Sequence, residues 1–247
     1  MEELYTTWKA IGVAGGDLSF FQDFFVKFYQ AFIEGDRWLQ YLNGVKTTLL
    51  VTALALILGI VLGVLVAMLR TAHDQQRPGH RNPILAVLNL ICKVYVTVIR
   101  GTPMMVQLLI MGFVIFASSR NFTMIGTLTL GINSGAYVSE IVRGGLMSVD
   151  KGQMEAGRSL GLGYGTTMRF VIVPQAVKAI LPALGNEFIV LLKDTSLITV
   201  IGGKELLYAA QGIYNRTYEQ MFPLVGTAAI YLVLVIILSW LLGKLER

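Results

Sequence analysis

Polar side chains interrupt apolar stretches of this sequence that are long enough to cross a bilayer, where burying them is costly and points to function. At 100° per residue, one helical face of the stretch from residue 171 onward collects small residues, one amide and one cation. The residues of this face are Ala179, Ala183, Asn186, Val190 and Lys193. They could line a narrow path for a small zwitterion whose carboxylate is attracted by Lys193. The alternative is helix packing through the small residues, with Lys193 and Asp194 at the helix end.

Further polar residues lie in or beside the same kind of apolar stretch. Residues 133–137 read Asn-Ser-Gly-Ala-Tyr, and Glu140 follows one turn later. Ser196 follows Lys193 and is flanked by apolar residues on both sides. Glu187 points away from the face that carries Asn186, so we expect it to serve packing or a subunit contact.

No pattern in the sequence indicates catalysis. There is no phosphate-binding GxxxxGK[ST] loop, no HExxH and no GxSxG, so we predict that the chain is not an enzyme and holds no cofactor. Cys92 lies among apolar residues and is expected to be a small buried hydrophobe. His73 and His80 are too few ligands for a metal site.

The composition of the chain is unusually apolar. Of 247 residues, 55% are hydrophobic and 14% are charged, with a mean hydropathy of +0.66. Soluble domains average about 25% charged residues. The chain is therefore expected to be an all-α integral membrane protein. Its net charge of +5 comes with no nucleic-acid motif, so we interpret it as membrane topology and predict no nucleic-acid partner.

Five stretches have the roughly 20 mostly apolar residues that a spanning helix needs. These predicted spans are 47–69, 101–119, 121–139, 171–192 and 221–243. Residues 83–99 form a further apolar stretch and could be the inner part of a long second span. In that case Arg100-Gly101-Thr102-Pro103 would break the span, since proline lacks an N–H and disfavours helix at the preceding residue.

The basic residues predict the orientation of these spans, because cytoplasmic loops are enriched in lysine and arginine. Three segments on one side of a five-span chain carry them: the loop after span one, the loop after span three, and the C-terminal tail. Their basic residues are Arg70, Arg77, Arg81, Arg143, Lys151, Arg158, Arg169, Lys244 and Arg247. The N-terminal segment is acidic. We therefore expect an external N-terminus and a cytoplasmic C-terminus.

Residues 1–43 are expected to form an extracytoplasmic or interfacial segment that precedes the membrane domain, residues 44–247. Phenylalanines recur there at helical spacing, at positions 20, 21, 24, 25, 28 and 32. They fit either an interfacial helix at the outer face or a prolongation of span one. Within span one, Gly59 and Gly63 form a GxxxG pattern, which fits internal helix packing as well as dimerisation.

The loop after span three carries a helix-turn-helix pattern on the cytoplasmic side. Residues 155–160 suit a short helix, and Gly161, Gly163 and Gly165 should break it, because glycine adopts positive φ at little cost. Residues 167–170 can restart the helix. A compact helix on one face of the bilayer usually docks a partner.

Residues 155–161, Glu-Ala-Gly-Arg-Ser-Leu-Gly, resemble the EAA loop of ABC importer permeases, with Gly157 in place of the usual second alanine. From about Lys46 to the C-terminus, the chain is similar to the permease subunits of polar amino acid ABC importers. The motifs that carry this resemblance are Arg100-Gly101-Thr102-Pro103 with Gln107, Asn133-Ser134-Gly135-Ala136-Tyr137 with Glu140, Arg143-Gly144-Gly145, Gly152-Gln153, Pro174-Gln175-Ala176, Leu181-Pro182, Asn186 and Lys193-Asp194-Thr195-Ser196-Leu197.

The resemblance implies a type I importer permease of about five helices in the bacterial plasma (inner) membrane, working by alternating access. Its implied partners are two cytoplasmic ATPase subunits that bind ATP and Mg, a second permease chain, an extracytoplasmic amino-acid-binding protein, and the lipid bilayer. The loop 152–170 would couple to the ATPase through Glu155, Ala156, Gly157, Ser159, Leu160 and Gly161. The implied substrate pathway consists of Arg100, Thr102, Gln107, Asn133, Tyr137, Ala183, Asn186, Lys193, Asp194 and Ser196.

Two questions stay open at this point. The face around Asn186 offers no carboxylate to a cationic substrate, which favours a neutral or acidic amino acid over a basic one. A secondary transporter or channel is the alternative function, although the inverted repeats of many secondary transporters are not apparent in the sequence.

Overall fold

The computed structural model describes residues 1–76 and 82–245, which fold almost entirely into helices. Arg77, Arg81 and Arg247, which contribute to the predicted orientation, and His80 lie outside the described residues. The α-helices are α1 (Glu2–Val13), α2 (Phe20–Phe32), α3 (Arg37–Asp74), α4 (Pro83–Gly101), α5 (Met104–Ile110), α6 (Phe122–Ser148), α7 (Lys151–Ser159), α8 (Tyr164–Thr167), α9 (Val173–Asp194), α10 (Leu206–Thr217) and α11 (Met221–Leu245). Between them lie the 3₁₀ segments η1 (Glu34–Asp36) and η4 (Thr195–Ile201) and the π-helical segments η2 (Met111–Ile115) and η3 (Met168–Ile172).

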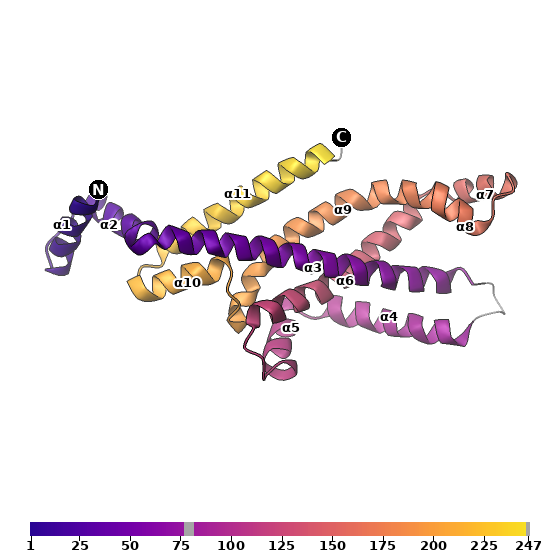
Figure 1. The fold of residues 1–247 in the computed structure, drawn as a ribbon, viewed down its shortest axis with the longest axis horizontal. Coiled ribbons are helices and arrows are strands. Elements are labelled where there is room, and N and C mark those ends of the chain that lie inside the picture. Colours follow the sequence, from indigo (N-terminus) through magenta and orange to yellow (C-terminus); the bar gives the residue numbers. More distant parts are fainter. Residues whose placement is uncertain (77–81, 246–247) are drawn as a thin grey trace.

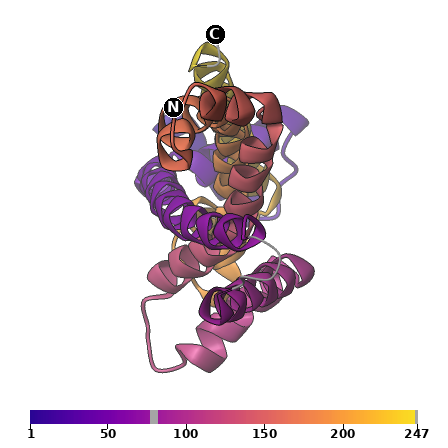
Figure 2. The same ribbon diagram turned by 90° about the vertical axis from the view of Figure 1, so that its right-hand side faces the viewer.

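Helix α3 sets the long axis of the molecule (Figure 1). Its 38 residues extend about 57 Å at 1.5 Å per residue. Helix α4 lies beside it, and α7 and α8 lie at the end of the molecule where α3 ends and α4 begins, whereas α1, α2 and α10 lie at the opposite end (Figure 1). The end-on view shows α3 and α4 running nearly along one direction (Figure 2).

Four helical stretches of the described chain are long and apolar enough to cross a membrane: Glu34–Asp74, Pro83–Gly101, Tyr164–Ile201 and Met221–Lys244. They confirm the predicted spans 47–69, 171–192 and 221–243. Helix α6 contains the predicted span 121–139 and extends about 40 Å with its 27 residues. Its glycines and polar side chains lower its hydropathy, which explains why it is not among these four.

The predicted span 101–119 is wrong. The long apolar helix is α4, which ends at Gly101, and the apolar helix that follows is only Met104–Ile115. Thr102 between them is extended (φ −116°, ψ 144°), as expected for a residue before a proline. The predicted break at residues 100–103 is thereby confirmed, and most of the apolar length of this region precedes the break.

The most extensive helix pair is α3 with α6, and glycines make it close. A Cβ atom on Gly59 would lie 2.7 Å from Ser134 Oγ, and one on Gly63 would lie 2.6 Å from Val138 Cβ. Gly131 of α6 faces Leu58 of α3 in the same way. The GxxxG pattern therefore serves packing within the chain, which confirms that interpretation.

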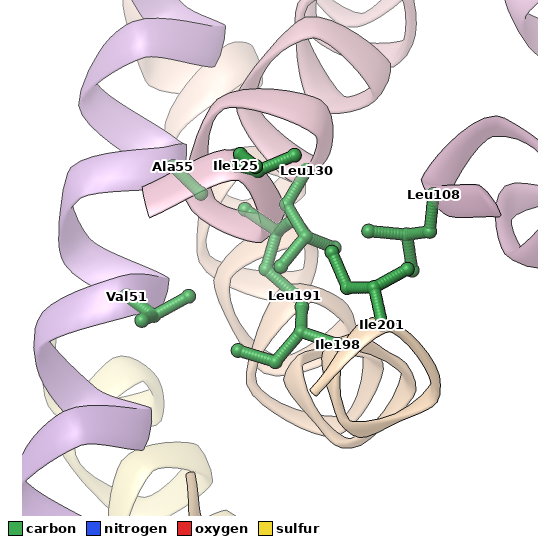
Figure 3. Close-up of a cluster of buried hydrophobic side chains, with 8 residues drawn as sticks. All are labelled: Val51, Ala55, Leu108, Ile125, Leu130, Leu191, Ile198 and Ile201. Atoms are coloured by element: carbon green, nitrogen blue, oxygen red, sulfur yellow. The ribbon is translucent and has the colours of Figure 1, made fainter. Parts of the chain in front are cut away.

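The apolar core lies where α3, α5, α6, α9 and η4 meet (Figure 3). Its buried members are Val51, Ala55, Leu108, Ile125, Leu130, Leu191, Ile198 and Ile201. Ile198 also packs closely against Gly126 and Gly203, so η4 is held in the centre of the bundle. The core thus fixes the end of α9, the helix that carries Asn186 and Lys193, against α6.

The phenylalanine-rich segment forms its own helix, α2. It begins with a capping box between Ser19 and Gln22 and is separated from α3 by η1, where Gly35 and Asp36 have positive φ (61° and 55°). The sharp change of direction excludes the prediction that α2 prolongs span one. An additional helix, α1, precedes it and packs against it.

In the helix-turn-helix at residues 151–172, only some of the glycines break the helix as predicted. Gly161 ends α7 with a φ of +80°, and Gly163 is the extended residue before α8. Gly165 lies inside α8, so the prediction that it breaks the helix is wrong, because an interior glycine costs only about 1 kcal/mol. The helix restarts at Tyr164 rather than at residue 167.

Candidate functional site

A glutamine bridges the break between α4 and α5. Nε2 of Gln107 donates hydrogen bonds to the carbonyl oxygens of Ile99 (2.7 Å) and Thr102 (3.1 Å) and to Oγ1 of Thr102 (2.8 Å). The last carbonyls of a helix have no partner within the helix. Gln107 satisfies that of Ile99 and also the carbonyl of Thr102 just beyond the helix, and so holds the broken backbone in one shape.

The same glutamine joins this break to α6. Nδ2 of Asn133 donates to Oε1 of Gln107 at 3.0 Å. One turn further along α6, the ring of Tyr137 lies 5.2 Å from the guanidinium carbon of Arg100, a cation–π contact. The structure therefore brings together five of the predicted pathway residues: Arg100, Thr102, Gln107, Asn133 and Tyr137.

The other predicted pathway residues lie on α9 and the start of η4. Asn186 and Lys193 are exposed in the single chain, and Ala183, which precedes them on the same face, is half-buried. Oγ of Ser196 donates to the carbonyl oxygen of Lys193 at 2.7 Å, and Asp194 is half-buried. Among the described residues, no recorded hydrogen bond joins this second group to the first.

Glu187 confirms the predicted helical faces, because it lies on the buried side of α9 while Asn186 is exposed. Its side chain is 9% exposed, and its Oε1 accepts a hydrogen bond of 2.7 Å from Oγ of Ser134 in α6. The predicted packing role of Glu187 is thus a link between α6 and α9.

The sequence did not predict one buried carboxylate, Glu205, which lies directly before α10. Glu205 is 1% exposed, and its Oε2 accepts hydrogen bonds from Tyr231 (2.5 Å) and Thr48 (3.3 Å). Its Oε1 accepts from the backbone N–H of Tyr208 and caps α10. Burial raises the pKa of Glu205, against these hydrogen bonds. The sequence signal that could have identified Glu205 is a glycine, Gly202, followed by an acidic residue just before a helix. In the structure, Gly202 forms a turn with a φ of +90°.

The helix of the predicted coupling loop, α7, presents most of its side chains to solvent. Asp150 caps it by accepting from the N–H of Gly152 at 2.6 Å. Gly157 is buried, and a Cβ atom there would lie 2.5 Å from Cγ2 of Thr167 in α8. The absence of a side chain at Gly157 therefore lets α7 and α8 pack closely. The predicted coupling residues that stay exposed are Glu155, Ala156, Ser159, Leu160 and Gly161.

A cavity of about 700 Å³ lies between α7, α8 and the neighbouring ends of α3 and α6. Its charged lining residues are Asp74, Arg143, Asp150, Lys151 and Arg158. Arg143 forms an ion pair of 3.0 Å with Asp74, and Tyr164 of α8 donates to Gln75 at the end of α3. The Tyr164 contact attaches the helix-turn-helix to the end of α3, and the ion pair holds the neighbouring ends of α3 and α6 together.

Neither Cys92 nor His73 belongs to a site of its own. Cys92 is buried, as expected for a small hydrophobe. Nδ1 of His73 lies 3.1 Å from Nδ2 of Asn89 and 3.4 Å from Asp74, which links α3 to α4. Within residues 1–76 and 82–245, no group of three or more acidic, histidine or cysteine side chains could hold a metal ion.

Residues 84–247 match the family described as the inner membrane component of binding-protein-dependent transport systems. This chain belongs to that family. The match begins at the second residue of α4 and contains the predicted coupling loop, both groups of predicted pathway residues and Glu187. It also makes the chain a non-catalytic transport component.

The relatives of this permease are amino acid transport proteins. It is 34% identical over 227 residues to a putative glutamine transport permease of Rickettsia typhi, covering 91% of this chain and 96% of the relative. It is 40% identical over 168 residues to the glutamine transport permease of Escherichia coli K12, covering 65% and 75% of the two chains.

Two solved structures of ABC transporters are also similar to this chain. A chain from a crystal structure described as an amino acid ABC transporter with histidines is 41% identical, with a TM-score of 0.76, covering 84% of this chain and 93% of that one. An inward-facing MetNI methionine ABC transporter chain shares the fold at 21% identity and a TM-score of 0.69, covering 87% and 98%.

These findings decide between the two functions left open by the sequence. The chain is a multi-pass permease subunit of an amino acid ABC importer, rather than a secondary transporter or channel. A permease of this family works with an ATPase and a binding protein.

Proposed function

We propose that this permease translocates a polar amino acid into the cytoplasm by alternating access, driven by two ATPase subunits that dock on α7. The observation that carries the proposal is the exposure of Glu155 and Leu160 on a short helix fixed to the bundle. Leu160 is 82% exposed, and Leu162 and Tyr164, which follow it in the sequence, are exposed as well, so the end of α7 presents neighbouring apolar side chains that fit a contact with another protein.

The construction of α7 suits the transmission of force. Gly157 packs against Thr167, Tyr164 attaches the region to the end of α3, and the ion pair of Arg143 with Asp74 joins that end of α3 to α6. A push on α7 would therefore move the ends of the membrane helices instead of bending a loop. Glu155 is placed to pair with a basic residue of the ATPase.

For the substrate path, we infer that the α9 face with Ala183, Asn186 and Lys193 lines the channel together with a second permease chain. The Gln107–Asn133 cluster supports this function by holding the α4–α5 break beside α6. The exposure of Asn186 and Lys193 in the single chain is consistent with a path shared between two chains. The partner chain would be a second copy or a similar permease.

The proposed orientation places α1, α2 and α10 outside and α7 in the cytoplasm. The exposed Arg158 in α7 and the predominantly acidic residues 1–36 support this assignment under the positive-inside rule. Residues 44–247 would then form the transport domain, preceded by an extracytoplasmic segment of residues 1–43.

Glutamine is the substrate we expect first. The named relatives transport glutamine, and the exposed face of α9 carries an amide, Asn186, and a cation, Lys193, but no exposed carboxylate between them. Histidine is the second candidate, because the 41% identical structure is described with histidines.

The test is ATP hydrolysis by the reconstituted complex of permease, ATPase and binding protein. Each amino acid is added in turn, with wild-type permease, Glu155→Ala, and Glu3→Ala as an exposed glutamate at the opposite end. We expect stimulation by glutamine that Glu155→Ala weakens and Glu3→Ala leaves unchanged. Equal stimulation in all three permeases would refute coupling through Glu155. Stimulation by histidine alone would refute glutamine as the substrate.

A further inference from the structure

The N-terminal helix α2 carries an aromatic stripe that packing within the chain leaves uncovered. Its residues, the aromatic stripe from here on, are Phe20, Phe21, Phe24 and Phe28, with exposures of 77%, 81%, 46% and 42%. At 100° per residue, these four side chains fall within an arc of about 100°. The family match begins at residue 84 and does not include them.

The stripe is continuous with the membrane-facing surface of α11. The rings of Phe24 and Phe28 lie 5.0 Å and 6.4 Å from the ring of Phe222, in the first turn of α11. In the following turn of α11, Leu224 and Val225 are also exposed. Since α11 is one of the four helices apolar enough to cross a membrane, we expect the bilayer to begin at about its first turn.

Exposed apolar residues at the start of α3 lie at the same end of the molecule. Trp38 is 48% exposed, and Leu39 and Leu42 are exposed beside it. Tryptophan is enriched at membrane–water interfaces. The stripe therefore continues an apolar border that α3 and α11 already present to lipid.

Polar contacts hold α2 against the neighbouring ends of α3 and α11. Lys27 forms ion pairs with Asp23 (2.7 Å) and with Glu219 just before α11 (3.8 Å). On the α3 side, Arg37 donates to the carbonyl oxygen of Gln30. Helix α2 is thus attached to the ends of both the first and the last membrane helix.

We propose that α2 lies in the interface of the outer leaflet and inserts its aromatic stripe among the lipid headgroups. The occupant of this surface is lipid. Attraction to anionic headgroups does not drive the insertion, because residues 1–36 hold six acidic and two basic side chains. The driving force is the burial of aromatic area, so the contact should be insensitive to lipid charge and salt.

The test uses the full permease in its complex with ATPase, reconstituted into liposomes. In a Cys92→Ala background, Phe21→Cys and Phe20→Cys carry a fluorophore on the stripe, and Gln30→Cys carries it off the stripe. Lipids with nitroxides just below the headgroups, roughly 5–10 Å deep, quench a label that enters this layer. We expect quenching of both stripe labels to exceed that of the Gln30 label by about twofold or more, in neutral and anionic liposomes alike.

Equal, weak quenching at all three positions would overturn the proposal. A second copy of the chain as occupant would instead give disulfide-linked dimers of Phe21→Cys without lipid quenching. The binding protein as occupant would give quenching of the labels by a nitroxide on that protein. Either result would also overturn the proposal, and the Phe20→Cys label keeps the test valid if Phe21→Cys fails to fold.

Discussion

Oγ of Ser134 on α6 donates a hydrogen bond of 2.7 Å to Oε1 of Glu187 on α9, and both side chains are buried. This contact crosses the packed helices that carry the two proposed polar groups. Because Glu187 is adjacent in sequence to Asn186, the contact also fixes which way Asn186 points. A structural carboxyl thus orients a side chain proposed to meet the substrate.

We predict that Ser134→Ala lowers the free energy of unfolding by about 1–3 kcal/mol, since it leaves a buried carboxyl without this donor. The midpoint of thermal unfolding in detergent measures the effect. Ser148→Ala, which removes a hydroxyl that donates to Gly145 near the surface, is the matched control and should stay within about 0.5 kcal/mol. Equal midpoints for the two variants would contradict a stabilising role for the Ser134–Glu187 contact.

Gly63→Ala should destabilise the chain by about 1–3 kcal/mol through overpacking of α3 against α6. The new Cβ atom would lie 2.9 Å from the backbone nitrogen of Ser139, which cannot move aside as a flexible side chain would. Gly144→Ala is the control, because its Cβ atom would meet no atom within 4 Å, and we expect a stabilisation of about 0.5–1 kcal/mol. Chemical or thermal unfolding of both variants checks the prediction. An unchanged stability of Gly63→Ala would contradict close packing of α3 against α6 at this position.

Asn186→Ala and Lys193→Ala should each lower amino acid uptake by roughly tenfold or more, as expected when a hydrogen bond to a charged group of the substrate is lost. Assembly with the ATPase should be unchanged. Uptake into proteoliposomes and co-purification of the ATPase are the two measurements, with Lys178→Ala as an exposed lysine on the same helix outside the proposed face. Normal uptake by both pathway variants would remove these residues from the path.

The attachment of α1 should weaken at alkaline pH. Nζ of Lys9 donates to Glu34 at 2.5 Å, and this hydrogen bond, followed by that with Tyr5, raises the pKa of Lys9. A raised pKa contributes stability that is complete below the ordinary lysine value of about 10.4 and is lost as the pH rises through the folded value.

Trp8 reports on this change, because its ring packs against Phe25 at 5.4 Å. We expect its fluorescence to shift in the alkaline range in wild type, and the shift to be reduced in Lys9→Met. An identical pH profile in both proteins would show that the Lys9–Glu34 contact does not hold α1.

The sequence by itself determined the class of protein and the places where its helices break. Its apolar stretches predicted an integral membrane protein, because lipid requires helices whose backbone groups bond within the segment. Pro103 and Gly161 marked a helix break and a helix end correctly, since both act through their own backbone geometry. The faces of α9 followed from helical periodicity alone, and so the separation of Asn186 from Glu187 was predictable.

Only the tertiary structure decided which partners these residues have. The contact of Gln107 with Asn133, the link from Ser134 to Glu187, and the burial of Glu205 join residues 26 to 157 positions apart, and no local pattern encodes such pairings. The sequence misplaced the second span because hydropathy cannot show on which side of a break the helix is long. It left α2 between two interpretations because the turn at Gly35 and Asp36 depends on how α2 packs against α3, α10 and α11.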